Sequence, residues 1–78
     1  MSLRVIWDAG AQAALLTRRQ WRTAAEIDAA VIRLAETGEG DLVAVGPLHH
    51  LRVAGHVVEL RLDREGGRLL VLDVYRVR

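Results

Sequence analysis

The first quarter of the chain changes from a short apolar run to a longer stretch rich in alanine and leucine. Residues 3–7 are mostly β-branched and aromatic, a pattern typical of a short strand. Asp8 follows as a candidate N-cap, and residues 9–19 predict a helix with Ala11 and Leu15 along one side. The chain is therefore expected to begin with a strand and then a helix.

A second helix is predicted from apolar residues at helical spacing. Thr23 and Glu26 form the pattern of a capping box, in which each side chain bonds a free amide at the helix start. On that basis the helix runs over residues 24–36 and ends near Gly38. Its buried stripe follows the i, i+3, i+4, i+7 pattern: Ile27, Ala30, Val31 and Leu34. Two helices with a short connection are expected to form an antiparallel hairpin.

The hydrophobic period changes to two after a turn at Gly46 and Pro47. Gly55 and residues 64–67 are the next turn signals. The segments between and after these turns predict a three-stranded antiparallel meander: residues 48–54, 56–63 and 68–78. Residues 42–45, before the first turn, fit either a short strand or an extended linker.

Strict alternation assigns the side chains of the last strand to two faces. Leu70, Leu72 and Val74 share one face. The other face takes Leu69, Val71, Asp73, Tyr75 and Val77. The expected fold is therefore α+β in the order β-α-α-β-β-β. It is an antiparallel sheet with a helical hairpin packed on one face and the other face at least partly open. Residues 1–78 are expected to form one domain, because so short a chain has no room for two.

Composition narrows the kinds of site and location. None of the 78 residues is cysteine, which excludes disulfides and thiolate metal sites and fits a cytoplasmic protein. No apolar run approaches the roughly 18 residues of a membrane span, and residues 1–10 lack the apolar core of a secretory signal. The formal net charge is +1, and all eleven basic residues are arginine. Two explanations fit that usage. One is codon bias in a GC-rich genome; the other is selection for bidentate contacts to phosphate or carboxylate.

All three histidines lie within residues 49–56. His49 and His50 are neighbours on a predicted strand, so their side chains point to opposite faces. His56 lies beyond a turn, and no carboxylate follows at a recognisable metal-ligand spacing. The interpretation is that they are half-buried or strand-edge histidines and that no metal or other cofactor is bound. One could still act as an acid or base, and the sequence does not select which.

Polar residues of the meander are expected to gather on the open face of the sheet, which is taken to be concave. They are Arg52 on the first strand, Glu59 and Arg61 on the second, and Asp73 and Tyr75 on the third. One interpretation is a solvated face with cross-strand ion pairs, worth about 0.2–1 kcal/mol each. The other is a phosphate-binding or acid–base site, in which arginine neutralises charge in a transition state. Arg76 and Arg78 add positive charge nearby, and the two acids partly cancel it.

A second basic cluster is expected at the tip of the helical hairpin. It consists of Arg18, Arg19 and Arg22, next to Trp21. One interpretation is a solvated loop, in which Trp21 fastens the hairpin to the core. The other is a contact with nucleic acid or the ribosome, in which the indole stacks on a base.

Three segments of the C-terminal half follow a recognisable order: LRVAGHVVEL at 51–60, a turn at 63–67 and LVLDV at 70–74. Together with the preceding strand and hairpin they resemble the RelE/ParE superfamily of bacterial toxins. Its members typically show an LRVGDYRVIYxID…VLxVxHR pattern after a helical hairpin, so the resemblance covers nearly the whole chain. Arg52 matches the arginine of the LRV motif. Val57 stands where the family has its second arginine, and Asp73 where many members carry a basic residue.

The resemblance implies the toxin of a type II toxin–antitoxin module, neutralised by an antitoxin whose extended segment wraps it. RelE-like members cleave mRNA in the ribosomal A site without a metal, and this is the first hypothesis for the chain. The catalytic residues would be Arg52, Arg61, Tyr75 and Arg76. The residues that bind nucleic acid would be Arg18, Arg19, Arg22 and Arg78.

Two other hypotheses remain open. ParE-like members share the fold, lack the catalytic set and poison DNA gyrase, so the hairpin and the last strand would be contact surfaces. The third hypothesis is a small homodimeric interaction module without toxicity, because so apolar a short chain suggests a covered surface. Its interface would cover Leu69, Val71 and Val77.

Overall fold

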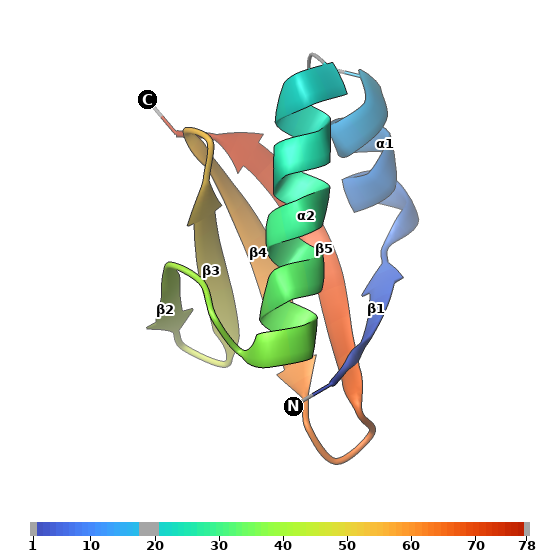
Figure 1. Cartoon of the computed structure of the whole chain (residues 1–78), viewed down its shortest axis with the longest axis vertical. Helices are drawn as coiled ribbons and strands as arrows, with labels where there is room; N and C mark the ends of the chain where they lie inside the picture. The colour runs from blue at the N-terminus through green and yellow to red at the C-terminus, as the bar shows by residue number, and fades with distance from the viewer. Residues whose placement is uncertain (1, 18–20, 78) are drawn as a thin grey trace.

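The computed structural model describes residues 2–17 and 21–77, which form two helices and a five-stranded sheet (Figure 1). In chain order the elements are β1 (Arg4–Trp7), α1 (Ala9–Thr17), α2 (Trp21–Thr37), β2 (Leu42–Val45), β3 (Leu48–Val53), β4 (His56–Asp63) and β5 (Arg68–Arg76). The strand order across the sheet is β1-β5-β4-β3-β2. The predicted α+β class is confirmed, and the ambiguous segment before the first turn is a strand, β2.

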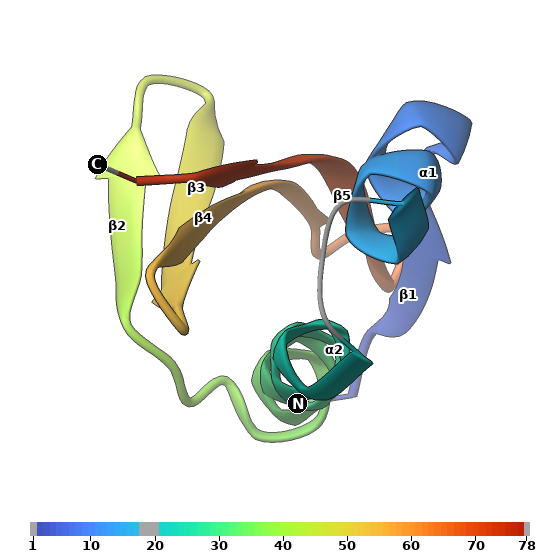
Figure 2. The same ribbon diagram turned by 90° about the horizontal axis from the view of Figure 1, so that it is seen from above.

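The two helices run in opposite directions (Figure 1), as the predicted hairpin requires. Seen from above, the sheet curves around α2, which lies along its concave face (Figure 2). Helix α1 packs mainly against β5 and also contacts α2. Neither helix, over the residues described, is both long enough and apolar enough to cross a membrane.

The core lies between α2 and the concave face of the sheet. Three residues of the predicted stripe on α2, Ile27, Val31 and Leu34, are buried, and Ala30 is half-buried. The sheet and α1 complete the core with Leu51, Val58, Leu60, Leu69, Val71, Val74, Ala11 and Leu15. Burying each large aliphatic side chain contributes about 1.5–3 kcal/mol, so this single layer of contacts is the main source of stability.

The sheet is mixed, where an antiparallel sheet was expected. β1 lies parallel to β5 with Val5 opposite Leu69 and Trp7 opposite Val71. A parallel pair needs a crossover connection, and here the chain between β1 and β5 includes both helices and the rest of the sheet. The N-terminal strand is therefore held by residues more than sixty positions away, and no local sequence pattern reports that pairing.

The faces predicted for the side chains of β5 are wrong, because β5 contains a β-bulge. Glu59 pairs with Asp73 but Leu60 pairs with Val71, so β5 has one extra residue at this point. Because of that extra residue, Leu69, Val71 and Val74 all face α2, while Asp73 and Tyr75 face away from it. Leu69 and Val71 have no exposed surface, so the dimer interface suggested for them is wrong; Val77 is exposed.

One helix boundary differs from the predicted one, and two others agree. Helix α2 begins at Trp21, three residues before the predicted start, so Thr23 and Glu26 lie within its first turns and form no capping box. Helix α1 is described as far as Thr17, and the two arginines predicted to continue it lie outside the described residues. The predicted N-cap is confirmed, because the Asp8 carboxylate accepts a hydrogen bond from the Gly10 amide at 3.1 Å. The predicted end at Gly38 is also confirmed by its left-handed φ of 78°.

The β4–β5 turn is organised by Asp63. Its carboxylate accepts hydrogen bonds from the Gly66 amide at 2.9 Å and from the Arg68 guanidinium at 2.6 Å. The Gly66 amide, and then the guanidinium, hold the pKa of the Asp63 carboxyl below its ordinary value of 3.8. The left-handed φ of Gly67 then returns the chain into β5.

Candidate functional site

The convex face of the sheet carries the polar residues that were expected to gather on a concave one. Two rows of side chains cross this open face, because the register aligns them on three strands. One row is Arg52, Val57 and Tyr75; the next is His50, Glu59 and Asp73. The predicted gathering of arginine, acid and tyrosine is therefore confirmed, on the face that α2 does not cover.

The centre of the open face is a cluster of three side chains. His50 Nε2 lies 3.5 Å from Glu59 Oε2. The His50 and Tyr75 rings meet edge to face, with centroids 6.3 Å apart and planes at 87°. The exposed fractions of the His50 and Glu59 side chains are 24% and 29%, so both reach solvent although their positions are restricted. A restrained and accessible imidazole beside a carboxylate is an arrangement suited to proton transfer.

The arginines of the open face flank this cluster. Arg52 lies two residues after His50 on β3, and Arg61 lies two residues after Glu59 on β4. Positions two apart on a strand share a face, so both arginines belong to the same surface, and both are exposed. The backbone of Arg52 is fixed by a 2.9 Å hydrogen bond from its amide to the Asp41 carbonyl. The two guanidinium groups are therefore available to an anion that approaches the cluster.

Two acids lie side by side in the row that contains His50. Glu59 pairs in register with Asp73. Asp73 Oδ1 accepts a hydrogen bond from the next backbone amide, that of Val74, at 2.8 Å. This bond ties the Asp73 carboxylate to the bulge of β5, whereas the Glu59 carboxylate extends toward His50. The two acids lower the positive potential of the face, as the sequence suggested.

Arg76 does not join the other predicted catalytic residues. It pairs in register with His56, which is buried on the side of the sheet that α2 covers. Alternation therefore directs the Arg76 side chain away from the open face. Arg78, the residue that follows Val77, lies outside the described residues.

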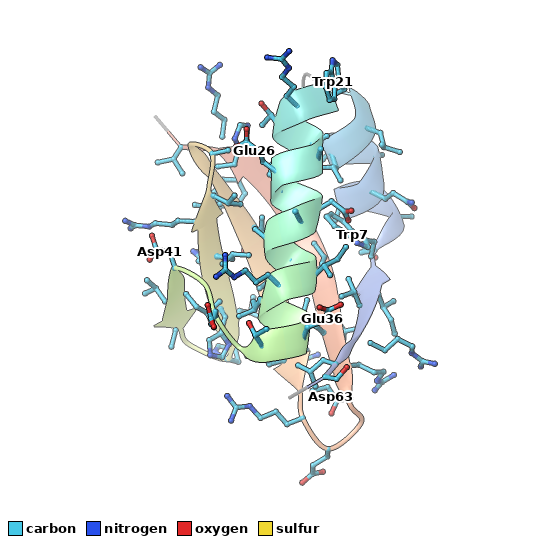
Figure 3. The ribbon with its side chains drawn as sticks, in the orientation of Figure 1. Trp7, Trp21, Glu26, Glu36, Asp41 and Asp63 are labelled. Carbon is cyan, nitrogen blue, oxygen red and sulfur yellow. The ribbon has the colours of Figure 1, made fainter. Side chains whose placement is uncertain are left out.

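The basic cluster at the hairpin tip is described only in part. Arg18 and Arg19 lie outside the described residues. Arg22 places its guanidinium 5.3 Å from the ring centroid of Trp21, a cation–π contact. Trp21 is 75% exposed at the start of α2 (Figure 3), so the indole does not fasten the hairpin to the core. An exposed indole and guanidinium remain suited to stacking on a base.

The three histidines have three different environments. His49 points to the covered side of the sheet, where its Nδ1 is buried without a hydrogen-bond partner in the described residues. His56 is buried, and its Nδ1 lies 2.7 Å from the Ala54 carbonyl oxygen. Only His50 faces the open side. The residues that the structure describes contain no group of three acids or histidines arranged to hold a metal ion.

The pairing of His50 with Glu59 is the part of the site that the sequence interpretation missed. A signal for it was present in the turn. Ala54 and Gly55 both have a left-handed φ, of 52° and 72°, as a two-residue hairpin turn requires. Counting outward from these two residues pairs Val53 with His56 and then His50 with Glu59. Assigning Ala54 to the strand hid that register.

Two solved structures are similar to this chain in fold over almost their whole length. One is a chain of the chromosomal ParDE toxin–antitoxin system from P. aeruginosa, 17% identical, with a TM-score of 0.74 and coverage of 97% of each chain. The other is a chain of the toxin–antitoxin complex RelBE2 from Mycobacterium tuberculosis. It is 19% identical, with a TM-score of 0.67, over 97% of this chain and 99% of that one. No protein-family model and no curated protein matches the sequence.

These similarities define the fold. The chain has the RelE/ParE-like α+β fold, with two helices and a mixed five-stranded sheet. The resemblance read from the C-terminal half is therefore confirmed at the level of the fold, although fewer than one residue in five is shared with either structure.

Proposed function

We propose that this chain is the toxin component of a type II toxin–antitoxin pair. The observation that carries the proposal is the agreement of the whole fold with chains of two toxin–antitoxin systems, over 97% or more of every chain compared. A toxin of this kind acts in the cytoplasm, and its partner is an antitoxin.

We further propose that the toxin acts by cleaving mRNA on the ribosome. What supports this is the chemistry of the open face. The exposed guanidinium groups of Arg52 and Arg61 lie on the same face as the paired side chains of His50 and Glu59. The Tyr75 ring contacts the His50 ring. Arg52 and Arg61 would bind the phosphate and offset the charge that develops on it, because guanidinium groups make bidentate bonds to phosphate oxygens. Tyr75 is the third residue assigned to the site. Arg76 lies on the other face of β5 and is left out of it.

The surface that suits the antitoxin is a groove between α2 and β3. Its apolar floor consists of Ala29, Ala30 and Leu51. Charged side chains stand along its sides, among them Glu26 on α2 and Asp41 before β2 (Figure 3). An extended or helical segment would place small apolar residues against this floor. Its polar side chains would then face the charged residues along the sides of the groove. Ala29→Arg should therefore weaken neutralisation in cells that express both proteins, and leave toxicity unchanged.

The experiment that tests the proposal is translation in vitro with purified protein, followed by mapping of new mRNA 5′ ends. Wild type should produce ends within codons at the ribosomal A site. Arg52→Ala should lose them, whereas Arg64→Ala, in the β4–β5 turn, should not. Intact message with normal protein output would contradict cleavage of mRNA. Toxicity in cells, and its suppression by the antitoxin, is measured separately and tests the toxin role itself.

The second candidate is a toxin that acts by binding DNA gyrase. The observation that favours it is the adjacent pair Glu59 and Asp73, since two carboxylates in the middle of the face repel an RNA backbone. Inhibition of supercoiling by purified gyrase, with message levels intact, would select this candidate. Induced cells should then form filaments and show a DNA-damage response.

A further inference from the structure

His50 is the histidine whose surroundings suit a chemical role. We propose that His50 transfers the proton in an RNA phosphodiester-cleaving site on the open face, and that Glu59 positions its imidazole. The inference rests on the cleavage activity proposed above. It assigns the proton transfer at the ribose 2′-hydroxyl to two residues, His50 and Glu59, that the resemblance to RelE/ParE toxins does not include.

His50 differs from the other two histidines in the face of the sheet that it occupies. The other two point to the covered side of the sheet. His49 has a buried Nδ1, and His56 places its Nδ1 2.7 Å from a backbone carbonyl oxygen. His50 alone combines contact with solvent and a carboxylate neighbour, because its side chain is 24% exposed and Glu59 lies directly opposite on β4.

The neighbours of His50 orient its imidazole. Nε2 is the nitrogen that faces Glu59 Oε2, at 3.5 Å. A neutral ring whose Nε2–H points at the carboxylate leaves Nδ1 as the proton acceptor. The edge-to-face contact with Tyr75 restrains rotation of the ring. Once Nδ1 has taken a proton, the adjacent carboxylate stabilises the imidazolium, as an acid beside a catalytic histidine does in other enzymes.

The position of the phosphate follows from that of Arg52. Arg52 lies two residues beyond His50 on the same strand and the same face, so the two Cα atoms are roughly 7 Å apart. A phosphate held by the exposed guanidinium of Arg52 can therefore have its neighbouring ribose over His50. Asp73 and Glu59 repel that phosphate, which favours its binding at the Arg52 end of the face, away from the acidic pair.

The reaction balances without a cofactor. His50 Nδ1 takes the proton of the 2′-hydroxyl, and the 2′ oxygen forms a bond to the adjacent phosphorus. The bond from phosphorus to the 5′ oxygen breaks, and that oxygen takes a proton from solvent. The products are a 2′,3′-cyclic phosphate and a 5′-hydroxyl, and His50 returns its proton to solvent. No oxidant, reductant or metal is required.

The test measures the cleavage rate of translated mRNA by purified variants. His50→Ala should lower kcat by about 100-fold or more, the usual contribution of a general base. Free imidazole in the buffer should restore part of that rate, because the site reaches solvent and the missing side chain leaves room for it. His49→Gln is the matched control, since it changes the adjacent histidine on the opposite face, and its rate should stay within about twofold of wild type. Circular dichroism verifies that each variant is folded.

Two further measurements separate proton transfer from a structural effect. A message with a 2′-deoxyribonucleotide at the mapped position should resist cleavage there. Glu59→Gln should lower kcat, by less than His50→Ala does, and leave KM unchanged, as expected of a positioning residue.

The outcomes distinguish this inference from the proposal on which it depends. If wild type cleaves mRNA and His50→Ala cleaves at the same rate, the role of His50 is overturned and the cleavage activity stands. A slow His50→Ala variant that imidazole does not accelerate would also overturn it, since the histidine would then be structural. If wild type leaves every message intact, both proposals fail together.

Discussion

The two faces of the sheet are made by the same strands and serve different purposes. On the concave face, Leu51, Leu60 and Val71 are almost or fully buried under α2. On the convex face, one residue away along the same strands, His50 and Glu59 remain accessible to solvent. Alternation of side chains therefore separates the residues that hold the fold from the candidate residues of the site along most of β3 and β4.

This difference means that stability and activity can be changed independently at adjacent positions. A single slip in register would exchange the two faces, so the turns and the bulge are as important to the site as its side chains.

The largest effect should come from Leu60→Ala on the concave face. Leu60 has no exposed surface, so the substitution should lower the free energy of unfolding by about 2–5 kcal/mol. Arg61→Ala, the next residue on the open face, should change it by no more than about 0.5 kcal/mol. Urea denaturation of both variants measures the contrast. Equal losses would mean that the open face also carries the fold.

A smaller effect is expected where the contrast between the faces is imperfect. Val57 is an apolar residue of the open face, flanked in register by Arg52 and Tyr75, and only 7% of it is exposed. Val57→Ala should cost about 1.6 kcal/mol, since it removes the equivalent of two buried methylene groups, each worth roughly 0.8 kcal/mol. Thermal unfolding measures this loss. A neutral substitution would show that Val57 is covered without contributing to stability.

The β3–β4 turn offers a change in the opposite direction. Ala54 has a left-handed φ of 52°, which strains an alanine by roughly 1 kcal/mol and suits asparagine better. Ala54→Asn should therefore stabilise the chain by up to about 1 kcal/mol, and raise Tm by roughly 4–8 °C per kcal/mol. Gly55→Ala, at a φ of 72°, should have the opposite sign. Two shifts of the same sign would contradict the two-residue turn and the register that it sets.

The smallest effect should depend on pH. The pKa of the Asp63 carboxyl is lowered by the Gly66 amide and then by Arg68, so the ionised form stabilises the folded state. That contribution is complete above the ordinary pKa of 3.8 and is lost as the pH falls through the lowered value. Asp63→Asn should therefore be less stable than wild type at neutral pH and equal to it in acid. Denaturation at several pH values tests this, and a difference independent of pH would contradict it.

Local patterns in the sequence predicted much of the fold. The helical spacing of Ile27, Val31 and Leu34 identified the buried side of α2, and the period of two identified β4 with its observed bounds. These predictions succeeded because each depends on residues a few positions apart. The start of α2 was wrong because the pattern of Thr23 and Glu26, which can cap a helix, occurs equally well inside one.

The sequence by itself determined the class of fold, the position of the turns, the apolar side of α2 and the polar character of the open face. Only the tertiary structure decided that β1 pairs with β5, that a bulge moves Val74 to the core side, and that His50 meets Glu59. The reason is physical. Propensity and period act between near neighbours, whereas pairing, register and the direction of a side chain are fixed by burial against strands and helices distant in the chain.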